Sequence, residues 1–534
     1  MIVLAVLIFV FICCVSLLLY GRKNYGILEK CGIPVVQPTL FLGSVPDFHS
    51  KVHQIEDIKR FKKYGPIWGV YEGQDPQIHI ADPELVRLIF VKDFDYFHDR
   101  RTMDFGSNVF NEILDYLPGR KWKTVRQMLT PMLTKSKLNL MSQVINESAT
   151  EFAEDLKNEC VDGKIKIDCR RFELKALHGL LDLSLTCKIH SRMTTWLIDM
   201  FTRATLGVQM GNAKDPKNEF AVAFRTFMGE DTVFDWIYSL SCNFLDLGSV
   251  FFLFHKLNVS VTFPFLIKFA PTFDNEPTNL IERIFRQILQ SRRSTAEKKN
   301  SDFVDILNEL IDRTKTNEYK ELQITEDTII SQAVNFFLGG YETSGTTSTV
   351  LLYYLARNLN VQRNLQREID SIYEKTNGNI DHDAIREEET PYLTACINEA
   401  LRLGPPLYRP ERVCTKDWSY GNIRIKRTTT IFLCLWALHR DESYFDDPDE
   451  FKPERFLPEN KDRINQYAFV PFGLGPRACI GIRFAYESLK LLFIHLIRNF
   501  EVKMRDDTNL QYKPGQQIIV AFKPLYLDLV KREK

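Results

Sequence analysis

The most continuous apolar pattern in the chain lies at its start. Residues 2–20 form an uncharged and strongly apolar run, which is long enough to cross the hydrocarbon core of a bilayer as a helix. Arg22 and Lys23 follow directly, and no small-residue cleavage motif precedes them. A cleaved signal peptide would have a charged start, a shorter apolar run and such a motif. The pattern therefore predicts one transmembrane anchor over residues 1–21, with the body of the protein in the cytosol.

The pattern after the anchor changes twice. Prolines interrupt regular structure in residues 22–50, which predicts an irregular proline-rich link. Two short strand patterns follow at 67–71 and 77–81, separated by a turn-rich break. Apolar residues then recur at helical spacing from about residue 83 to residue 392. These patterns predict one mainly α domain over residues 51–534, with a small β portion.

Two helices can be delimited more closely from the sequence. A long helix is expected over residues 325–358, because Thr325 is a suitable N-cap and two acidic residues follow it. A final helix is expected from about residue 481 to 499. Between the two, the pattern loosens beyond Pro405 into loops and short strands.

Composition narrows the class of protein. Lys+Arg and Asp+Glu both number 69, so the formal net charge is zero and nucleic acid is not expected as a partner. The 11 cysteines are scattered and form no CxxC pair. This distribution favours a reducing compartment over a disulfide framework.

One cysteine lies in an unusual segment. Residues 469–481 read F-V-P-F-G-L-G-P-R-A-C-I-G, which is incompatible with a regular helix or a central strand. A helical pattern resumes after Cys479, so the thiol is expected at a loop-to-helix junction where backbone N–H groups and the helix dipole favour a thiolate. Gly473 and Gly475 allow backbone to approach the sulfur, and Arg477 adds a positive charge. The alternative is an ordinary buried cysteine in a glycine-rich turn.

The complete spacing of this loop is more specific than any of its residues. Phe472 and Gly481 complete the pattern F-G-x-G-x-R-x-C-x-G, which resembles the haem-binding loop of the cytochrome P450 family. The order of anchor, link and later motifs extends this resemblance over nearly the whole chain, and it is nearest to the microsomal, drug- and steroid-oxidising members. The resemblance implies the cytochrome P450 fold and a haem b, iron protoporphyrin IX, with Cys479 as its axial thiolate and Phe472 beside the cofactor.

A second motif lies within the expected long helix. Residues 339–347 contain three glycines and four hydroxyl residues, which disfavour a stable helix. The segment could simply be poorly packed. It resembles, however, the oxygen-activating motif A/G-G-x-D/E-T-T/S of the same family, and the resemblance implies that Glu342 and Thr343 form an acid–alcohol pair. Oxygen activation consumes protons, which a carboxylate and a hydroxyl can deliver.

Cationic and structural residues complete the resemblance. Trp122 and Arg126 match the W-x-x-x-R motif, and the resemblance implies that they, Arg412 and Arg477 contact the haem propionates. Arg101 is a further candidate. For each arginine the alternative is a surface charge. Three further residues resemble the structural triad of the family and are expected to hold the cysteine loop rather than to catalyse: Glu399, Arg402 and Arg455.

The resemblance implies a monooxygenase that inserts one oxygen atom from O2 into a lipophilic substrate. No nucleotide-binding glycine motif precedes a βαβ pattern, so electrons are expected from outside the chain. The resemblance implies that they come from NADPH through a membrane-bound cytochrome reductase. The expected location is the endoplasmic reticulum membrane, single-pass, with the catalytic domain facing the cytosol. The Phe- and Leu-rich residues 234–265 are equally compatible with a pocket roof or with ordinary core.

Two alternatives remain at the level of sequence. Some haem-thiolate relatives act as isomerases or dehydratases on a peroxide without O2, but they tend to lack the threonine found here as Thr343. The chain could also be an inactive haem-binding copy. About fifteen residues around 178–192 are extra relative to the family pattern and could impair folding.

Overall fold

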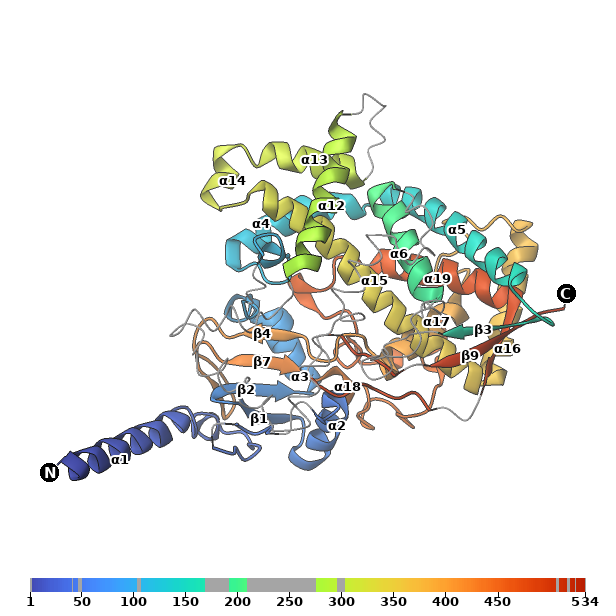
Figure 1. Cartoon of the computed structure of the whole chain (residues 1–534). Helices are drawn as coiled ribbons and strands as arrows, with labels where there is room; N and C mark the ends of the chain where they lie inside the picture. Colours follow the sequence, from blue (N-terminus) through green and yellow to red (C-terminus); the bar gives the residue numbers. More distant parts are fainter. Residues whose placement is uncertain are drawn as a thin grey trace, which may run out of the picture.

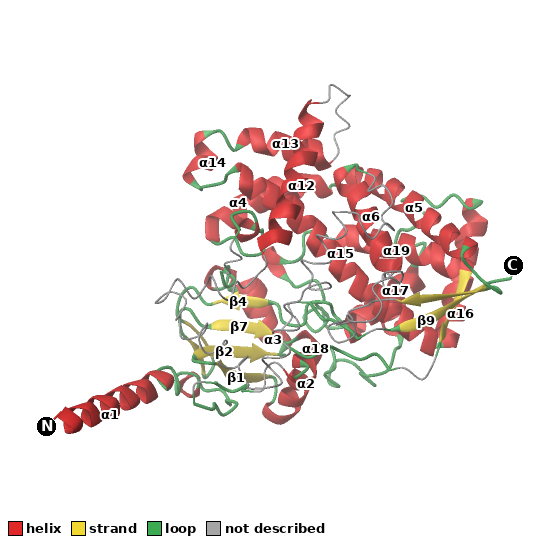
Figure 2. Cartoon of the chain, viewed as in Figure 1, coloured by secondary structure: helices red, strands yellow, loops and turns green. Residues whose placement is uncertain are grey.

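A mainly helical body lies beside a smaller sheet region, and one helix projects away from the sheet region (Figure 1, Figure 2). The computed structural model describes residues 2–40, 42–46, 50–102, 107–168, 192–208, 275–294, 303–505, 509–515, 519–523 and 525–533. The described helices are α1 (Ile2–Gly21), α2 (His53–Tyr64), α3 (Pro83–Arg87), α4 (Gly119–Leu129), α5 (Lys135–Asn158), α6 (Arg192–Phe201), α12 (Asn275–Ser294), α13 (Phe303–Arg313), α14 (Asn317–Glu321), α15 (Glu326–Arg357), α16 (Leu359–Thr376), α17 (Pro391–Leu403), α18 (Leu435–Leu438) and α19 (Ile482–Asn499). The described strands are β1 (Ile67–Glu72), β2 (Asp75–Ile80), β3 (Lys164–Asp168), β4 (Glu411–Val413), β5 (Trp418–Tyr420), β6 (Ile423–Ile425), β7 (Thr430–Leu433), β8 (Phe500–Met504) and β9 (Tyr526–Lys531).

The strands form small sheets that join distant parts of the chain. The largest has the order β1-β2-β7-β4, and the β1–β2 pairing from Ile67↔Ile80 to Glu72↔Asp75 confirms the expected hairpin. β2 and β7 run parallel although they are far apart in sequence. The β3-β9-β8 sheet joins the C-terminal strand to the segment after α5. The prediction of a mainly α fold with a small β portion is therefore confirmed.

The long central helix forms where the sequence predicts it. α15 begins after Thr325, whose hydroxyl accepts the N–H of Thr328 at 3.3 Å, while the Thr328 hydroxyl accepts the N–H of Thr325 at 3.1 Å. This reciprocal cap satisfies two donors that the first helical turn would leave unpaired. Most of α15 is buried, and it crosses the helical body beside α6, α12 and α17 (Figure 1).

The proline-rich link packs on the sheet instead of hanging free. Gly69 of β1 donates its N–H to Pro34 O at 2.8 Å, and its carbonyl accepts the N–H of Val36 at 2.9 Å. Leu28 is fully buried in the same region. The prolines therefore fix the course of a segment whose carbonyls and apolar side chains extend the edge of the sheet.

The N-terminal apolar run forms helix α1, which points away from the body (Figure 1). Every described side chain from Leu4 to Tyr20 is exposed, although the helix is apolar. Side chains at several positions of α1 lie outside the described set. Among the residues that the structure describes, no helix combines the length and hydropathy that a membrane crossing needs.

The extra segment around residues 178–192 and the Phe- and Leu-rich residues 234–265 lie outside the described residues, apart from Arg192 at the start of α6. Helix α6 itself is firmly packed. Trp196 donates its indole N–H to Ser148 O of α5 at 3.0 Å, and Phe201 lies against α15. A Cβ at Gly340 would lie 2.1 Å from the Phe201 ring, so this glycine permits the close approach of α6 to α15.

Candidate haem site

The loop before Cys479 has a backbone that only its glycines allow. Gly473 and Gly475 have φ of +71° and +73°, and a Cβ at Gly475 would lie 1.9 Å from Phe90 O. The Cys479 N–H donates to Phe472 O at 2.9 Å and closes the loop. The loop conformation thus explains why glycines stand at these two positions, and α19 begins directly after it.

The Cys479 thiol is free and its residue is exposed at the end of the loop. Burial raises the pKa of the Cys479 thiol, while a hydrogen bond from the Gly481 N–H and the charges of Arg126 and Arg100 act in the opposite direction. The protein alone therefore does not make a stable thiolate, and coordination by a metal would be what removes the proton.

Four arginines lie close to one another beside the cysteine loop, and two of them, Arg100 and Arg126, act on the Cys479 thiol. Arg477 donates to Leu117 O at 2.7 Å and to Asp115 O at 3.3 Å, and its guanidinium lies 4.2 Å from the Trp122 ring centroid. Burial, and after it the charge of Arg100, lowers the pKa of Arg477 to about 9. Arg412 is buried, and burial with the charges of Arg100 and Arg477 also lowers its pKa.

The arginine cluster carries more positive charge than the carboxylates beside it neutralise. We define the cluster as Arg100, Arg126, Arg412 and Arg477. The Nε atoms of Arg100, Arg412 and Arg477 are buried without a hydrogen-bond partner. Asp115 binds Arg100 through an ion pair, and Asp99 lies 3.7 Å from Arg477. Four guanidinium groups and two carboxylates leave two positive charges, which match the two carboxylates of a dianionic haem. The residues present therefore fit the cofactor.

The structure separates the arginines that the sequence grouped together. Arg126, Arg412 and Arg477 belong to one electrostatic cluster. Arg101 instead donates to Glu411 Oε2 at 2.8 Å and lies 3.7 Å from Glu72, so two carboxylates already use its charge. Its neighbour Arg100, which sequence reasoning missed, takes the place in the cluster. Neighbouring side chains in an extended segment point in opposite directions, so the sequence could have indicated that only one of Arg100 and Arg101 faces the cluster.

Helix α15 continues without a break through its glycine-rich segment. Gly339 is exposed and has no atom within 4 Å of the Cβ position, although the helix on both sides is largely buried. The Thr343 hydroxyl is exposed and donates to Gly339 O at 2.6 Å, which is the back-bonding expected of such a threonine. Glu342 is buried. Gly339 thus leaves open space on this face of α15, whereas Gly340 serves the packing of α6.

The structural triad forms as expected and reaches further than the sequence indicates. Arg402 and Glu399 are fully buried and joined by two hydrogen bonds of 2.8 Å, with Arg455 Nε 3.4 Å from Glu399. The Val470 N–H donates to His439 Nε2 at 3.2 Å, and Arg402 donates to His439 O at 2.9 Å. His439, which sequence reasoning did not select, therefore connects the triad to the start of the cysteine loop.

A second buried cysteine lies in a different environment. Cys434, His79 and Asp57 are close enough for a metal site, with Cys434 Sγ 3.6 Å from His79 Nδ1. Arg409, however, donates to both oxygens of Asp57, at 2.5 and 2.6 Å. Burial acts to raise the pKa of Asp57, but Arg409 outweighs it and holds that pKa well below its usual range. The group is a buried ion pair in which both carboxylate oxygens already accept hydrogen bonds from Arg409. A metal cation there would be repelled by the guanidinium.

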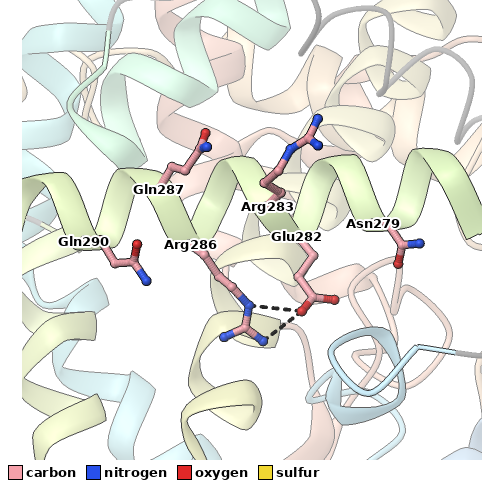
Figure 3. Close-up of a pocket in the computed structure, with 6 residues that line it drawn as sticks. All are labelled: Asn279, Glu282, Arg283, Arg286, Gln287 and Gln290. Carbon is pink, nitrogen blue, oxygen red and sulfur yellow. Dashed lines mark hydrogen bonds and ion pairs between the residues drawn. The ribbon is translucent and has the colours of Figure 1, made fainter.

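A surface hollow lies along α12, away from the loop of Cys479. Figure 3 shows six polar side chains of this one helix, with Arg286 bound to Glu282 at 3.0 and 2.8 Å. Arg286 also reaches Asp327 at the start of α15 at 2.5 Å. None of the residues selected from the sequence lines this hollow. It is a solvent-facing surface of ion pairs, and we therefore assign the candidate active site to the loop of Cys479 instead.

The protein combines a mainly helical body, a glycine-rich cysteine loop and an arginine cluster that can bind two carboxylates. This combination is typical of haem-thiolate proteins. The family model for cytochrome P450 matches residues 33–529. Relatives include cytochrome P450 3A12 of Canis lupus familiaris, 30% identical over 97% of this chain and 95% of that protein. Cytochrome P450 3A5 of Homo sapiens is 29% identical over the same shares, and lithocholate 6-beta-hydroxylase of Mesocricetus auratus is 30% identical. The chain belongs to the cytochrome P450 family and is a cytochrome P450 monooxygenase with a haem held by a cysteine thiolate.

Proposed function

We propose that this protein inserts one oxygen atom of O2 into a lipophilic substrate at a haem b whose axial ligand is Cys479. The observation that carries the proposal is the arginine cluster beside the loop of Cys479, with three buried guanidinium nitrogens that lack a partner. Arg100, Arg126, Arg412 and Arg477 would hold the propionates, and Trp122 would support Arg477 from its other side. Phe472 contributes through the carbonyl that fixes Cys479. Arg101 is then a neighbour of this site that holds Glu411 in place.

The cofactor, when bound, supplies reductive activation of O2. The chain's own residues supply the protons and their direction. The exposed Thr343 hydroxyl would leave Gly339 O and donate a hydrogen bond toward the oxygen bound at the cofactor. Glu342, in the same turn, is the carboxylate from which that hydroxyl would be reprotonated. The Cys479 thiolate would hold the iron and donate electron density to it.

Replacing Thr343 with alanine is expected to reduce product formation by about 10²-fold, while NADPH oxidation continues and releases peroxide. The hydroxyl is the group placed to deliver a proton. Without it, NADPH would still be oxidised, but oxygen would not be inserted into the substrate. Product and peroxide would be measured with ¹⁸O2, NADPH and an added flavoprotein reductase. Thr343→Ser, which keeps the hydroxyl, is the matched control. Product without ¹⁸O would favour the isomerase, and unchanged formation of ¹⁸O-labelled product in Thr343→Ala would refute proton delivery by Thr343.

The inactive-copy alternative receives no support from the described residues. The extra segment ends where α6 begins, and α6 nonetheless packs against α5 and α15 through Trp196 and Phe201. A segment that disturbed the core would be expected to displace this helix first. The redox partner that the family requires is, we propose, an NADPH–cytochrome reductase of the same membrane.

We also propose that residues 1–21 anchor the protein in the endoplasmic reticulum membrane, with residues 22–50 as the link and 51–534 as the catalytic domain. Support comes from an uncharged helix, α1, whose described side chains face solvent at up to 68% exposure. Removing residues 2–21 is expected to release the protein from alkali-washed microsomes, because burial of apolar surface in lipid would be lost. The full chain serves as the control. Its extraction by the same wash would refute the anchor.

A further inference from the structure

The ring of Phe201 lies directly against the glycine-rich segment of α15. Phe201 is the last residue of α6, which packs beside α15, and it is fully buried (Figure 1). A Cβ at Gly340 would lie 2.1 Å from Cε1 of this ring, 2.6 Å from Cζ and 3.0 Å from Cδ1. The ring therefore occupies the space in which any other residue at position 340 would place its side chain.

Neighbouring rings from two helices hold the Phe201 side chain in this place. The Phe337 ring of α15 meets it edge-on, with the ring centroids 6.3 Å apart. The Phe484 ring of α19 lies against it at 5.3 Å, and Phe336 of α15 contacts the same Phe484 ring at 5.9 Å. A closely packed interior leaves a ring little room to shift. Phe201 therefore acts as a spacer between α15 and α19.

The two helices that Phe201 contacts carry the two sides of the candidate active site. Helix α19 begins three residues after Cys479. On α15, Gly340 directly follows Gly339, whose carbonyl accepts the Thr343 hydroxyl at 2.6 Å. Gly339 has open space at its Cβ position, so consecutive residues of α15 face this space and the Phe201 ring. A displacement of α15 at Gly340 would therefore move the Thr343 hydroxyl as well.

Helix α6 is itself fixed by contacts with α5. Trp196 donates its indole N–H to Ser148 O at 3.0 Å. Arg203 pairs with Glu151 at 2.8 Å. These two contacts lie on either side of Phe201 in the sequence, so the backbone that carries the ring is held from both directions.

We propose that Phe201 is a positioning residue of the reaction, because its ring sets the separation of α15 from α19 and with it the place of the Thr343 hydroxyl relative to Cys479. The inference rests on the proposed function, which gives that hydroxyl its role in proton delivery. Proton transfer requires donor and acceptor within hydrogen-bond reach. A misplacement of about 1 Å can cost on the order of 10²-fold in rate. Phe201 acts through Gly340 and needs no contact with substrate or cofactor.

The test is a double-mutant cycle on the full-length ferrous holoprotein, followed by the infrared stretching band of bound carbon monoxide. Gly340→Ala is expected to shift and broaden this band, because the added methyl group displaces α15 from the ring. Product formed per NADPH should fall by about tenfold in the same variant. A leucine at position 201 lacks Cε1 and Cζ, the two ring atoms nearest to the added methyl group. In Phe201→Leu/Gly340→Ala the band should therefore return toward its wild-type position, and product per NADPH to within about twofold of the wild type.

Phe152→Leu is the matched control for this rescue. The Phe152 ring stacks on Trp196 from α5, with the centroids 5.4 Å apart. The same loss of ring atoms at this other contact of α6 should not restore the band of Gly340→Ala. Restoration by Phe152→Leu would overturn the proposal, because the rescue would then reflect a general loosening of α6.

Two further results would overturn the proposal and leave Phe201 as ordinary core: a wild-type band in Gly340→Ala, or a displaced band that persists in the double variant. If Gly340→Ala fails to retain haem, Phe201→Leu alone takes its place. Loss of the ring should then broaden the band, and an unchanged band would count against the proposal. The band does not depend on turnover, whereas ¹⁸O incorporation tests the proposed function. Product without ¹⁸O would therefore refute monooxygenation and leave the band shift and its rescue unaffected.

Discussion

Replacing Cys479 with alanine is expected to abolish the strongly red-shifted Soret band of the reduced carbon monoxide complex and all oxygen insertion. That band requires a thiolate opposite carbon monoxide, and Cys479 is the cysteine beside the arginine cluster that would hold the propionates. Without the thiolate, the iron also loses the electron density that favours O–O cleavage. The wild-type protein and Cys479→Ala would be compared by absorption spectroscopy after dithionite reduction and exposure to carbon monoxide.

Cys434→Ala is the matched control for this experiment. Cys434 is fully buried and lies beside His79 and Asp57, which makes it the rival ligand on proximity alone. Because Arg409 occupies both Asp57 oxygens, we expect Cys434→Ala to keep the red-shifted band and to lose only some stability. Loss of the band in Cys434→Ala with its retention in Cys479→Ala would reverse the assignment. A pyridine haemochrome spectrum of the same samples identifies the porphyrin as haem b or another type.

The sequence predicts the elements of this fold well where a local pattern is strong. The hairpin, the capped helix α15 and the final helix α19 appear within a few residues of their expected positions. Each depends on interactions that are short-range in sequence: a tight turn, an N-cap, or apolar residues at helical spacing. The loop of Cys479 is equally local, because two positive-φ glycines fix its course.

The parts that the sequence did not predict depend on contacts between distant segments. Arg100 rather than Arg101 joins the arginine cluster because the backbone turns one side chain toward Asp115 and the other toward Glu411. Asp115 carries no motif, and only the structure shows that it pairs with Arg100. Side-chain direction and long-range pairing are not encoded in local spacing, so these residues needed the structure.

His439 shows the same limit in the structural triad. The sequence identifies Glu399 and Arg402 by their spacing on one helix face, which is a local feature. The route from that pair to the cysteine loop passes through His439, whose Nε2 accepts the Val470 N–H, so its other ring nitrogen carries the proton. Burial lowers the pKa of His439 to about 3, so the ring is neutral and can serve as this acceptor over the whole neutral range.

Replacing Arg402 with alanine is therefore expected to destabilise the protein by about 3–5 kcal/mol, because it leaves the Glu399 carboxylate buried without its main partner. Arg402 also donates to three backbone carbonyls, those of His439, Pro448 and Glu450, at 2.9, 2.6 and 3.1 Å. These acceptors would lose their donors in the same step. The loss would be measured as a lower midpoint of urea unfolding and as faster release of haem to an acceptor protein.

Two variants make this result interpretable. Arg402→Lys keeps a positive charge but cannot form the two parallel bonds to Glu399, so an intermediate loss is expected. Arg386→Ala removes an exposed arginine that lies 3.7 Å from Asp383, and its effect should stay below about 1 kcal/mol. If Arg402→Ala unfolded at the wild-type urea concentration, the buried pair would not be holding the loop. If it were destabilised without faster haem release, the triad would stabilise only the helical body. The contacts through His439 would then not stabilise the loop of Cys479.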